Sequence, residues 1–315
     1  MSVTVNCLTG PATYTSKTDR ILPARLAAPI TQDSFWHPAL LGGVLWRGLT
    51  HIKIHREILH FLFRCPPLAE FVIKNPGFAC KYLTPRYLAR GFTVPERARC
   101  FLHHYQQLFA RMPDSLFRQT LQENITIHEI SESAHCFTIS LGLSRPYNTE
   151  GELSLNLHVD GVIVFVLGFT IAPGSVVQSP AREVMLVTRL QGVKDTYTQI
   201  ALATKALHDV APSALLLAAL QGVADAFGIG EIVAVSAVRQ SSYRIYTPAV
   251  FLQAYDEFFS EVGMSKTANG FYRTSVPIQG KPLTSIKHGH KLRTKEKRAF
   301  KQQIQSACAR FLGAC

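Results

Sequence analysis

The sequence has 315 residues, of which 47% are hydrophobic and 17% charged, and 33 Lys and Arg against 21 Asp and Glu give a formal net charge of +12. This length allows one large domain or two small ones, and the apolar composition excludes an intrinsically disordered chain. The basic balance indicates an anionic partner, such as nucleic acid, lipid head groups or an acidic ligand.

The positive charge is concentrated in the two flanks of the chain. Residues 1–130 carry a net charge of +7, residues 131–280 carry −3 and residues 281–315 carry +8. We therefore expect anion binding in the flanks and any chemistry in the middle. Four segments are predicted: a loosely ordered lead-in (1–34), a helical region (35–124), an α/β core (125–280) and a basic C-terminal helix or tail (281–315).

No membrane-spanning or secretory segment is predicted. The first residues lack a basic stretch followed by an apolar run, and charged or polar residues interrupt the two most apolar stretches, 153–172 and 210–227. The seven cysteines are scattered without a C-x-x-C pair, which favours reduced thiols over a disulfide framework. The expected location is the cytoplasm, either free or peripheral on the inner membrane.

Helical periodicity dominates the segment 35–124. Residues 51–63 place Ile54, Ile58 and Leu62 on one face of a helix, which Pro66-Pro67 ends. A later helix begins after Thr93, a plausible N-cap, and ends near Met112-Pro113.

His51 and His55 lie one helical turn apart and could bind a metal. A third ligand at suitable spacing is missing, so the favoured interpretation is a pair on a helix surface and no metal is predicted.

The pattern changes to strands after residue 124. The segment 151–171 predicts a hairpin with Asp160-Gly161 at its tip, and the order of elements after it predicts an α/β (α+β) fold with a mixed sheet. The predicted strands are 125–131, 135–143, 152–157, 162–171, 182–191, 231–238 and 271–278. The predicted helices are 196–207, a second from Pro212-Ser213 to Gly228, and an amphipathic helix over 249–262.

Standard nucleotide-binding and hydrolase motifs are absent. The sequence has no G-x-x-x-x-G-K-[ST], H-E-x-x-H or G-x-S-x-G. Gly228-Ile229-Gly230 follows a predicted helix, whereas a dinucleotide fingerprint follows a strand, so a Rossmann site is rejected.

Three residues are candidate catalytic groups. Glu150 and Glu152 are two positions apart at the start of the hairpin, so in a regular strand both carboxylates would point into one space, where one could act as a general base. Alternatively, they are exposed hairpin ends. Tyr255 is a candidate general acid, although its aromatic neighbours also fit a core-packing stripe.

A candidate cofactor face follows the strand that ends at Gln191-Gly192. Free backbone N–H groups gather where strand ends meet helix N-termini, and this favours an anion. Thr204, Lys205, His208 and Ser213 would add a cation, an imidazole and hydroxyls near such a site. An ordinary exposed helix end remains the alternative.

The basic tail is a candidate surface for anionic lipid or for nucleic acid. Nucleic acid is less favoured because few aromatic residues are interleaved and no recognition motif accompanies the charge. A solvated helix is the alternative, and the oligomeric state is not predicted. The candidate anion-binding residues are Lys287, Lys291, Arg293, Lys297 and Arg298.

Several of the motifs described above resemble those of the bacterial VirK/YbjX family, whose shared domain has no known function. The resemblance covers roughly Phe35 to Lys301, with Phe259 standing where the family pattern has Trp and Asp209 where it has a Gly turn. The motifs that carry it are Arg145-Pro146-Tyr147, Glu150-Gly151-Glu152-Leu153, Leu190-Gln191-Gly192, Ala203-Thr204-Lys205-Ala206-Leu207-His208 with Pro212, Ala254-Tyr255-Asp256 with Phe258, and His288…Arg293…Lys297-Arg298.

The resemblance implies a virulence- and envelope-associated role in Gram-negative bacteria, including resistance to cationic antimicrobial peptides. The order of elements also resembles the acyl-CoA N-acyltransferase core, which implies acyl-CoA as cofactor and an envelope or peptide substrate. The usual phosphate loop of that superfamily, [QR]-x-x-G-x-[GA], is absent. The two hypotheses are an acyltransferase-like enzyme and a non-catalytic adaptor that binds anionic lipid or a partner protein through its basic flanks.

Overall fold

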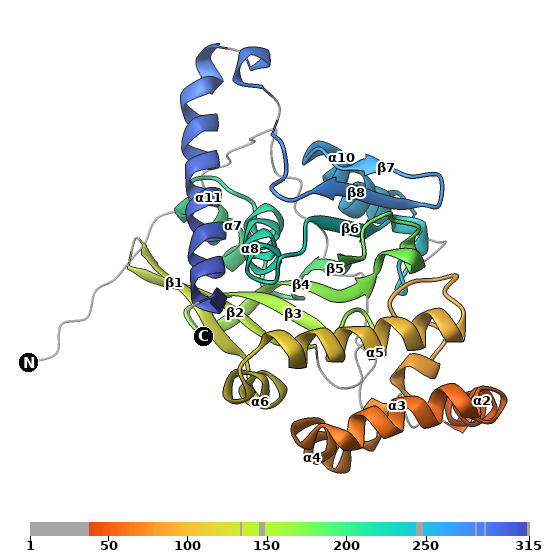
Figure 1. The fold of residues 1–315 in the computed structure, drawn as a ribbon. Coiled ribbons are helices and arrows are strands. Elements are labelled where there is room, and N and C mark those ends of the chain that lie inside the picture. The colour runs from red at the N-terminus through yellow and green to blue at the C-terminus, as the bar shows by residue number, and fades with distance from the viewer. Residues whose placement is uncertain are drawn as a thin grey trace, which may run out of the picture.

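A computed structural model describes residues 38–313 apart from 133, 145–148, 244–247, 281 and 287. Within these ranges the chain folds into an N-terminal group of helices followed by an eight-stranded mixed sheet with helices on both faces (Figure 1). The predicted α/β class, with a helical N-terminal region ahead of a mixed sheet, is confirmed.

The N-terminal helices begin and end where Pro and capping residues dictate. Thr93, predicted as the N-cap of this helix, caps α5 through a capping box with Glu96. The helix α5 ends at Arg111, before Met112-Pro113. Pro66, predicted to end a helix, also begins the next one, where its missing N–H costs no hydrogen bond. The helices are α2 (Pro38–Thr50), α3 (Ile52–Arg64), α4 (Pro66–Lys74), a 3-10 helix (Pro76–Leu83), α5 (Val94–Arg111) and α6 (Asp114–Gln122).

The sheet is antiparallel except at one pair of neighbouring strands. Its order is β1-β2-β3-β4-β5-β6-β8-β7, and only the pairing of β5 with β6 is parallel among the described strands. The strands are β1 (Ile125–Glu132), β2 (His135–Leu143), β3 (Leu153–Val159), β4 (Val162–Pro173), β5 (Glu183–Gly192), β6 (Glu231–Val235), β7 (Ser265–Lys266) and β8 (Phe271–Ser275).

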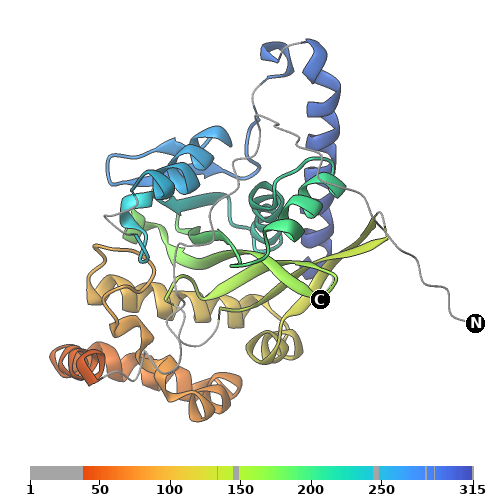
Figure 2. The same cartoon turned by 180° about the vertical axis from the view of Figure 1, so that it is seen from behind.

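Helices cover the two faces of the sheet. The helix α5 runs along one face with α2–α4 beyond it, and α7 (Tyr197–Ala206), α8 (Pro212–Ala226) and α11 (Lys291–Gly313) lie on the other, as the two opposite views show (Figures 1 and 2). Gly222 of α8 lets α11 approach closely, because a Cβ there would lie 2.2 Å from the Gln305 carbonyl oxygen. The C-terminal basic segment is thus a packed helix that buries Phe300, Ile304 and Cys308.

The predicted helix over 249–262 is not a regular α-helix. It consists of α9 (Pro248–Phe251), a π-helix (Leu252–Glu257) and α10 (Phe258–Glu261). The predicted strands 231–238 and 271–278 are also shorter than expected, because β6 ends at Val235 ahead of a 3-10 helix (Ala237–Arg239) and β8 ends at Ser275 ahead of a bend. The strand β7 was not predicted, since two residues carry no periodic signal.

The described part of the chain contains neither a membrane-spanning helix nor a disulfide bond. None of its helices combines the length and the apolar character needed to cross a bilayer. Its cysteines, Cys65, Cys80, Cys100, Cys136 and Cys308, are free thiols, and Cys65, Cys100 and Cys308 are buried.

Candidate active site at the carboxyl ends of β5 and β6

The two parallel strands separate at a bulge. The strand β5 pairs with β6 only from Met185 to Val187. On its other edge, Val187 lies opposite Phe169 and Arg189 opposite Gly168, so Thr188 is an extra residue in β5. Ligands of α/β sheets bind outside the carboxyl ends of parallel strands, and bulges are frequent beside active sites. This end of β5 is therefore the first place to look for a site.

Buried polar groups with unused hydrogen-bonding capacity gather at these strand ends. Arg189 and Gln191 lie two positions apart on β5 beyond the bulge, and Ser236 and Gln240 follow β6. Arg189 Nε, Gln191 Oε1, Ser236 Oγ and Gln240 Oε1 are buried without a hydrogen-bond partner, and they are four of the ten such side-chain atoms among the described residues. Buried polar atoms in folded proteins are nearly always bonded, so this concentration marks groups suited to bind a ligand.

Glu150 contributes a carboxylate to the same place. Its Oε1 accepts a hydrogen bond of 2.8 Å from the Ser241 hydroxyl, and its Oε2 lies 3.8 Å from Arg189 Nε. Glu150 is 8% exposed. Gly168 permits this position, because a Cβ there would lie 2.3 Å from the Glu150 carbonyl oxygen. The carboxylate is thus held between a hydroxyl and a guanidinium at the strand ends.

Tyr255 comes to the Glu150 carboxylate from the π-helix. Burial raises the pKa of its hydroxyl, and the negative charge of Glu150 raises it further. A hydrogen bond with the backbone of Leu190 and the charge of Arg189 oppose these effects without cancelling them. The raised pKa keeps the Tyr255 hydroxyl protonated at neutral pH, so it can donate a hydrogen bond.

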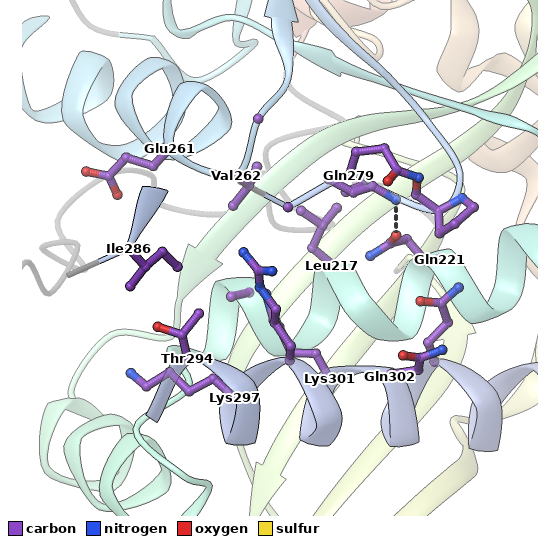
Figure 3. A pocket seen from close by; sticks show the side chains of 17 residues that line it. Leu217, Gln221, Glu261, Val262, Gln279, Ile286, Thr294, Lys297, Lys301 and Gln302 are labelled. Atoms are coloured by element: carbon purple, nitrogen blue, oxygen red, sulfur yellow. Dashed lines mark hydrogen bonds between the residues drawn. The ribbon is translucent and has the colours of Figure 1, made fainter. Parts of the chain in front are cut away.

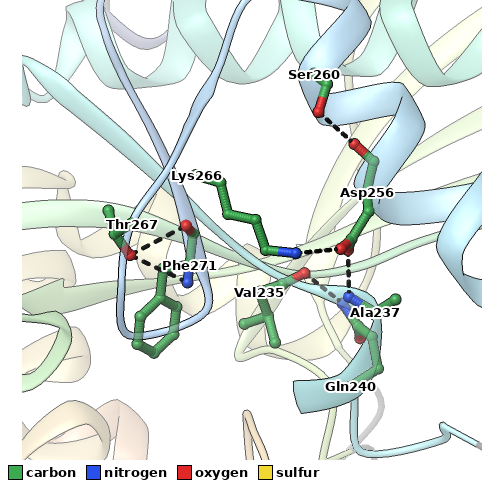
Figure 4. A network of polar contacts seen from close by, with 8 residues as sticks. All are labelled: Val235, Ala237, Gln240, Asp256, Ser260, Lys266, Thr267 and Phe271. Carbon is green, nitrogen blue, oxygen red and sulfur yellow. Dashed lines mark hydrogen bonds and ion pairs between the residues drawn. The ribbon is translucent and has the colours of Figure 1, made fainter.

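Asp256 fixes the π-helix against the segment that follows β6 (Figure 4). Its Oδ1 accepts a 2.7 Å hydrogen bond from the Ala237 N–H, and its Oδ2 lies 2.8 Å from the ammonium of Lys266. Gln240 donates to the carbonyl of Val235 at 3.0 Å in the same network. Single π-helical turns inserted in α-helices are frequently found at functional sites, and this one holds Tyr255 beside β5.

Glu152 lies in a different environment from Glu150. Its carboxylate is 2.6 Å from the ammonium of Lys81 and accepts hydrogen bonds from the hydroxyls of Tyr87 and Tyr105. All four residues are buried. The two glutamates do not share a space because Gly151 between them has φ +120°, which interrupts the alternation that the sequence prediction assumed. Glu152 therefore links the helical region to the sheet.

The predicted cofactor residues divide into two groups. Gln191 and Gly192 lie at the end of β5, where the side chain of Ile200 in α7 packs against Gly192. Farther along α7, the Thr204 hydroxyl donates to the Ile200 carbonyl and Lys205 is exposed.

The remaining residues of that prediction lie toward α8 and α11. The His208 ring contacts Phe300 of α11 with 4.7 Å between centroids, and Ser213 is buried at the start of α8. The predicted cofactor residues thus belong to separate elements, with Gln191 and Gly192 at the end of β5, Thr204 and Lys205 on α7, and Ser213 on α8.

The predicted anion-binding residues also have different surroundings. Lys287 lies outside the described residues, and Lys291 begins α11. Arg293 pairs with Asp209 at 2.7 Å, and Lys297 donates to the Asp209 carbonyl. Arg298 lines a cavity between α8 and α11.

No metal centre is formed in the part of the chain that the structure describes, where no group of three His, Cys, Asp or Glu side chains converges. In the His51–His55 pair, His55 Nδ1 lies 3.0 Å from the hydroxyl of Tyr82.

Sequence reasoning missed Arg189, Ser241 and Asp256. Arg189 had a detectable signal, because it is the one charged residue within the apolar run 184–191 and charged side chains rarely enter a sheet unpaired. Ser241 had none, since its partner Glu150 lies 91 residues away. Asp256 stands in an aromatic stripe that was interpreted as core packing.

Comparison with known proteins places the chain in a family. The family described as "Protein of unknown function (DUF535)" matches residues 44–309. An uncharacterized protein of Haemophilus influenzae is 25% identical over 62% of this chain and 65% of its own length, so the chain spans about two thirds of that relative. The uncharacterized protein YbjX of Escherichia coli is 23% identical over 80% of this chain and 77% of its own. No solved structure matches. The chain therefore belongs to the DUF535 family, and the predicted membership of the VirK/YbjX family is confirmed.

Proposed function

We propose that this protein is an acyltransferase whose reaction takes place at the carboxyl ends of β5 and β6. The observation that carries the proposal is the gathering of Glu150, Tyr255 and four unsatisfied buried polar atoms where the one described parallel strand pair separates at a bulge. The substrates would be an acyl thioester, with acyl-CoA as the first candidate donor, and an amine on an envelope component or peptide.

The roles of the residues follow from their chemistry. The Glu150 carboxylate would accept a proton from the attacking amine as the C–N bond forms. The Tyr255 hydroxyl, which its raised pKa keeps protonated, would donate a hydrogen bond to the thiolate as the C–S bond breaks. The thiolate would then take up the proton that Glu150 accepted from the amine. Arg189 and Gln191 would hold the donor through their unused polar atoms.

The order of elements supports the same activity by analogy. Two helices, α7 and α8, connect the parallel strands β5 and β6, and a further helix leads to the antiparallel pair β7 and β8. This order resembles the acyl-CoA N-acyltransferase core. The loop after β5 lacks the glycines of that superfamily's phosphate loop, so the donor phosphates would need other partners, such as the exposed Lys194.

Thioester binding and turnover test the proposal. Acetyl-CoA and octanoyl-CoA, each at about 1 mM, should raise the Tm of the full chain by mass action, and thiol release with a panel of primary amines should report transfer. Glu150→Gln should lower the rate by about 10²–10⁴-fold with little effect on donor binding, and Tyr255→Phe should act in the same direction. Glu57→Gln, which changes an exposed glutamate, is the control. No Tm shift with either thioester would overturn the proposal.

A second candidate function is that of an adaptor on an anionic membrane. Exposed apolar side chains, Leu45, Trp46 and Leu49 of α2, are followed by Ile52 at the start of α3, each more than half exposed. The exposed cations Lys53 and Arg56 come next in the chain, and α2 lies far from the sheet (Figure 2). Apolar and cationic side chains together are typical of helices that lie in a membrane interface.

A virulence- and envelope-associated role, including resistance to cationic antimicrobial peptides, stays a prediction from the resemblance.

Vesicle sedimentation tests this second function. The full chain should sediment with vesicles containing anionic lipid more than with neutral vesicles, and Trp46→Ala with Leu49→Ala should weaken that binding. Val162→Ala, at an exposed position on the β-hairpin, is the control. Point substitutions are preferred to removal of residues 281–315, because α11 contributes buried side chains to the core. Equal sedimentation with neutral and anionic vesicles would contradict this function.

A further inference from the structure

A cavity of about 620 Å³ lies between α8 and α11, on residues that the proposed reaction does not use (Figure 3). Its walls come from α8 between Ala214 and Gln221, the end of α10, the segment 277–280, Ile286, and α11 between Thr294 and Gln305. The segment 277–280 follows β8, whose Ser275 pairs with Glu231 at the beginning of β6. The cavity therefore lies toward the amino end of β6, whereas Glu150 lies toward its carboxyl end. Cavities of about 300–1,000 Å³ are the usual size of small-molecule sites.

Cations of α11 form one wall of the cavity. Thr294, Lys297, Arg298 and Lys301 follow one another at spacings of one helical turn or less, so they lie on one face of the helix, and Glu261 is the one acidic residue among the described lining residues. Lys301 forms no hydrogen bond or ion pair with a described residue. Burial lowers the pKa of Lys301, and the neighbouring charge of Arg298 lowers it further. The charged form of Lys301 is therefore destabilised here, and a bound anion would stabilise it.

Polar and apolar groups complete the lining. Gln221 accepts a 2.7 Å hydrogen bond from the Ile278 N–H through Oε1 (Figure 3), which leaves its Nε2 as a donor. The guanidinium of Arg298 packs against Gly280, where a Cβ would lie 3.1 Å from Cζ. Apolar side chains, those of Leu217, Val262 and Ile286, occupy the remaining wall. This combination suits a ligand with an anionic group and an apolar part.

We propose that the cavity between α8 and α11 binds the phosphate group of a small organic phosphate, with Arg298 and Lys301 as its principal cationic contacts. A guanidinium and an ammonium together are the donors proteins use most for phosphate. The phosphate can belong to a soluble phosphate ester or to a phospholipid head group, and both present the same chemistry to these side chains. The site is independent of the proposed acyl transfer.

Two arms of one binding experiment test the proposal and distinguish the sources. In the first, calorimetry and thermal shift measure binding of glycerol 3-phosphate and AMP to the full chain, with NaCl added to match ionic strength. In the second, sedimentation measures binding to phosphatidylcholine vesicles with and without phosphatidic acid. Arg298→Gln and Lys301→Gln are the test variants, and Lys295→Gln, at an exposed position of α11, is the matched control. Circular dichroism confirms that each variant is folded.

Each outcome decides the proposal. Binding of either soluble ester, weakened about tenfold to hundredfold by Arg298→Gln or Lys301→Gln and unchanged by Lys295→Gln, supports a soluble ligand. Binding only to phosphatidic acid vesicles, with the same dependence on the variants, supports a lipid head group. Absence of binding in both arms, or binding that the two test variants leave unchanged, overturns the proposal. Because Glu150 and Tyr255 are not altered, failure here leaves the test of acyl transfer unaffected.

Discussion

The Glu152 carboxylate and the Lys81 ammonium form an ion pair with no exposed surface on either side chain. Two tyrosine hydroxyls complete the shell of the carboxylate, and burial raises the pKa of both tyrosines, so both remain donors. Removing one partner of such a pair leaves an uncompensated buried charge, and this destabilises a protein more than the intact pair stabilises it.

Lys81→Met should therefore lower the free energy of unfolding by about 3–5 kcal/mol, measured by urea denaturation. Arg118→Gln is the control, because its pairs with Glu70 and Asp114 are exposed and exposed pairs contribute about 0–1 kcal/mol. A loss below about 1 kcal/mol in Lys81→Met would contradict a stabilising buried ion pair between Lys81 and Glu152.

His104 makes stability depend on pH below neutrality. Its Nδ1 accepts a 3.0 Å hydrogen bond from the Ile171 N–H, and burial, followed by the charge of Lys81, holds its pKa well below the usual value. The unfolded chain takes up a proton on this residue as pH falls below about 6.5, whereas the folded chain does not. His104 therefore lowers the free energy of unfolding below pH 6.5, by at most about 1.4 kcal/mol per pH unit.

Replacing His104 with Asn should flatten this dependence. The amide oxygen can accept from Ile171 in place of Nδ1, but it does not titrate. Urea denaturation at pH 7.5 and pH 5.5 should show a smaller loss of stability on acidification in His104→Asn than in the wild type. Equal losses in the two proteins would show that His104 titrates normally in the folded state.

At the scale of elements, the contact between α8 and α11 depends on Gly222. A Cβ at Gly222 would overlap the Gln305 carbonyl and approach the Cβ of Cys308 to 2.9 Å, and backbone atoms cannot move aside without shifting a helix. Gly222→Ala should cost about 1–3 kcal/mol of unfolding free energy through overpacking. Gly42→Ala, also within a helix but with nothing within 4 Å, should stabilise by up to about 1 kcal/mol. Stabilisation by both substitutions would contradict the close approach of α11.

The sequence predicted elements whose signals are local. The N-cap at Thr93, the Asp160-Gly161 turn and the strand pattern of β5 are set by neighbouring residues, and all appear where expected. The π-helix could not be predicted, because its extra residue per turn depends on contacts of Tyr255 and Asp256 with β5 and Ala237, which lie far away in the chain.

The candidate site was predictable in part for the same reason. Glu150, Gln191 and Tyr255 were proposed from their places at strand ends and on a helix, and the structure brings them to one region. Glu152 was grouped with Glu150 because a two-residue spacing assumes a regular strand, and the positive φ of Gly151 breaks that assumption. Periodicity alone carries no information on which distant side chain, such as Ser241, completes a site.

At the scale of the whole molecule, the net charge of +12 separates into surfaces with different surroundings. The cations of α11 lie partly in pairs with Asp209 and partly around the cavity beside α8, whereas the mildly acidic middle of the chain builds the sheet and holds Glu150. We therefore propose chemistry at the carboxyl ends of β5 and β6 and anion binding in the helical layer.

A crystal structure of the full chain grown with saturating CoA would show whether the donor binds at the carboxyl ends of β5 and β6. We expect the pantetheine arm between β5 and β6 beyond Val187, with its thiol beside the Glu150 carboxylate and the Tyr255 hydroxyl. Arg189 or Gln191 should be bonded to the ligand. A structure in which CoA is absent from this position, while Arg189 and Gln191 bond to groups of the chain itself, would contradict the proposal.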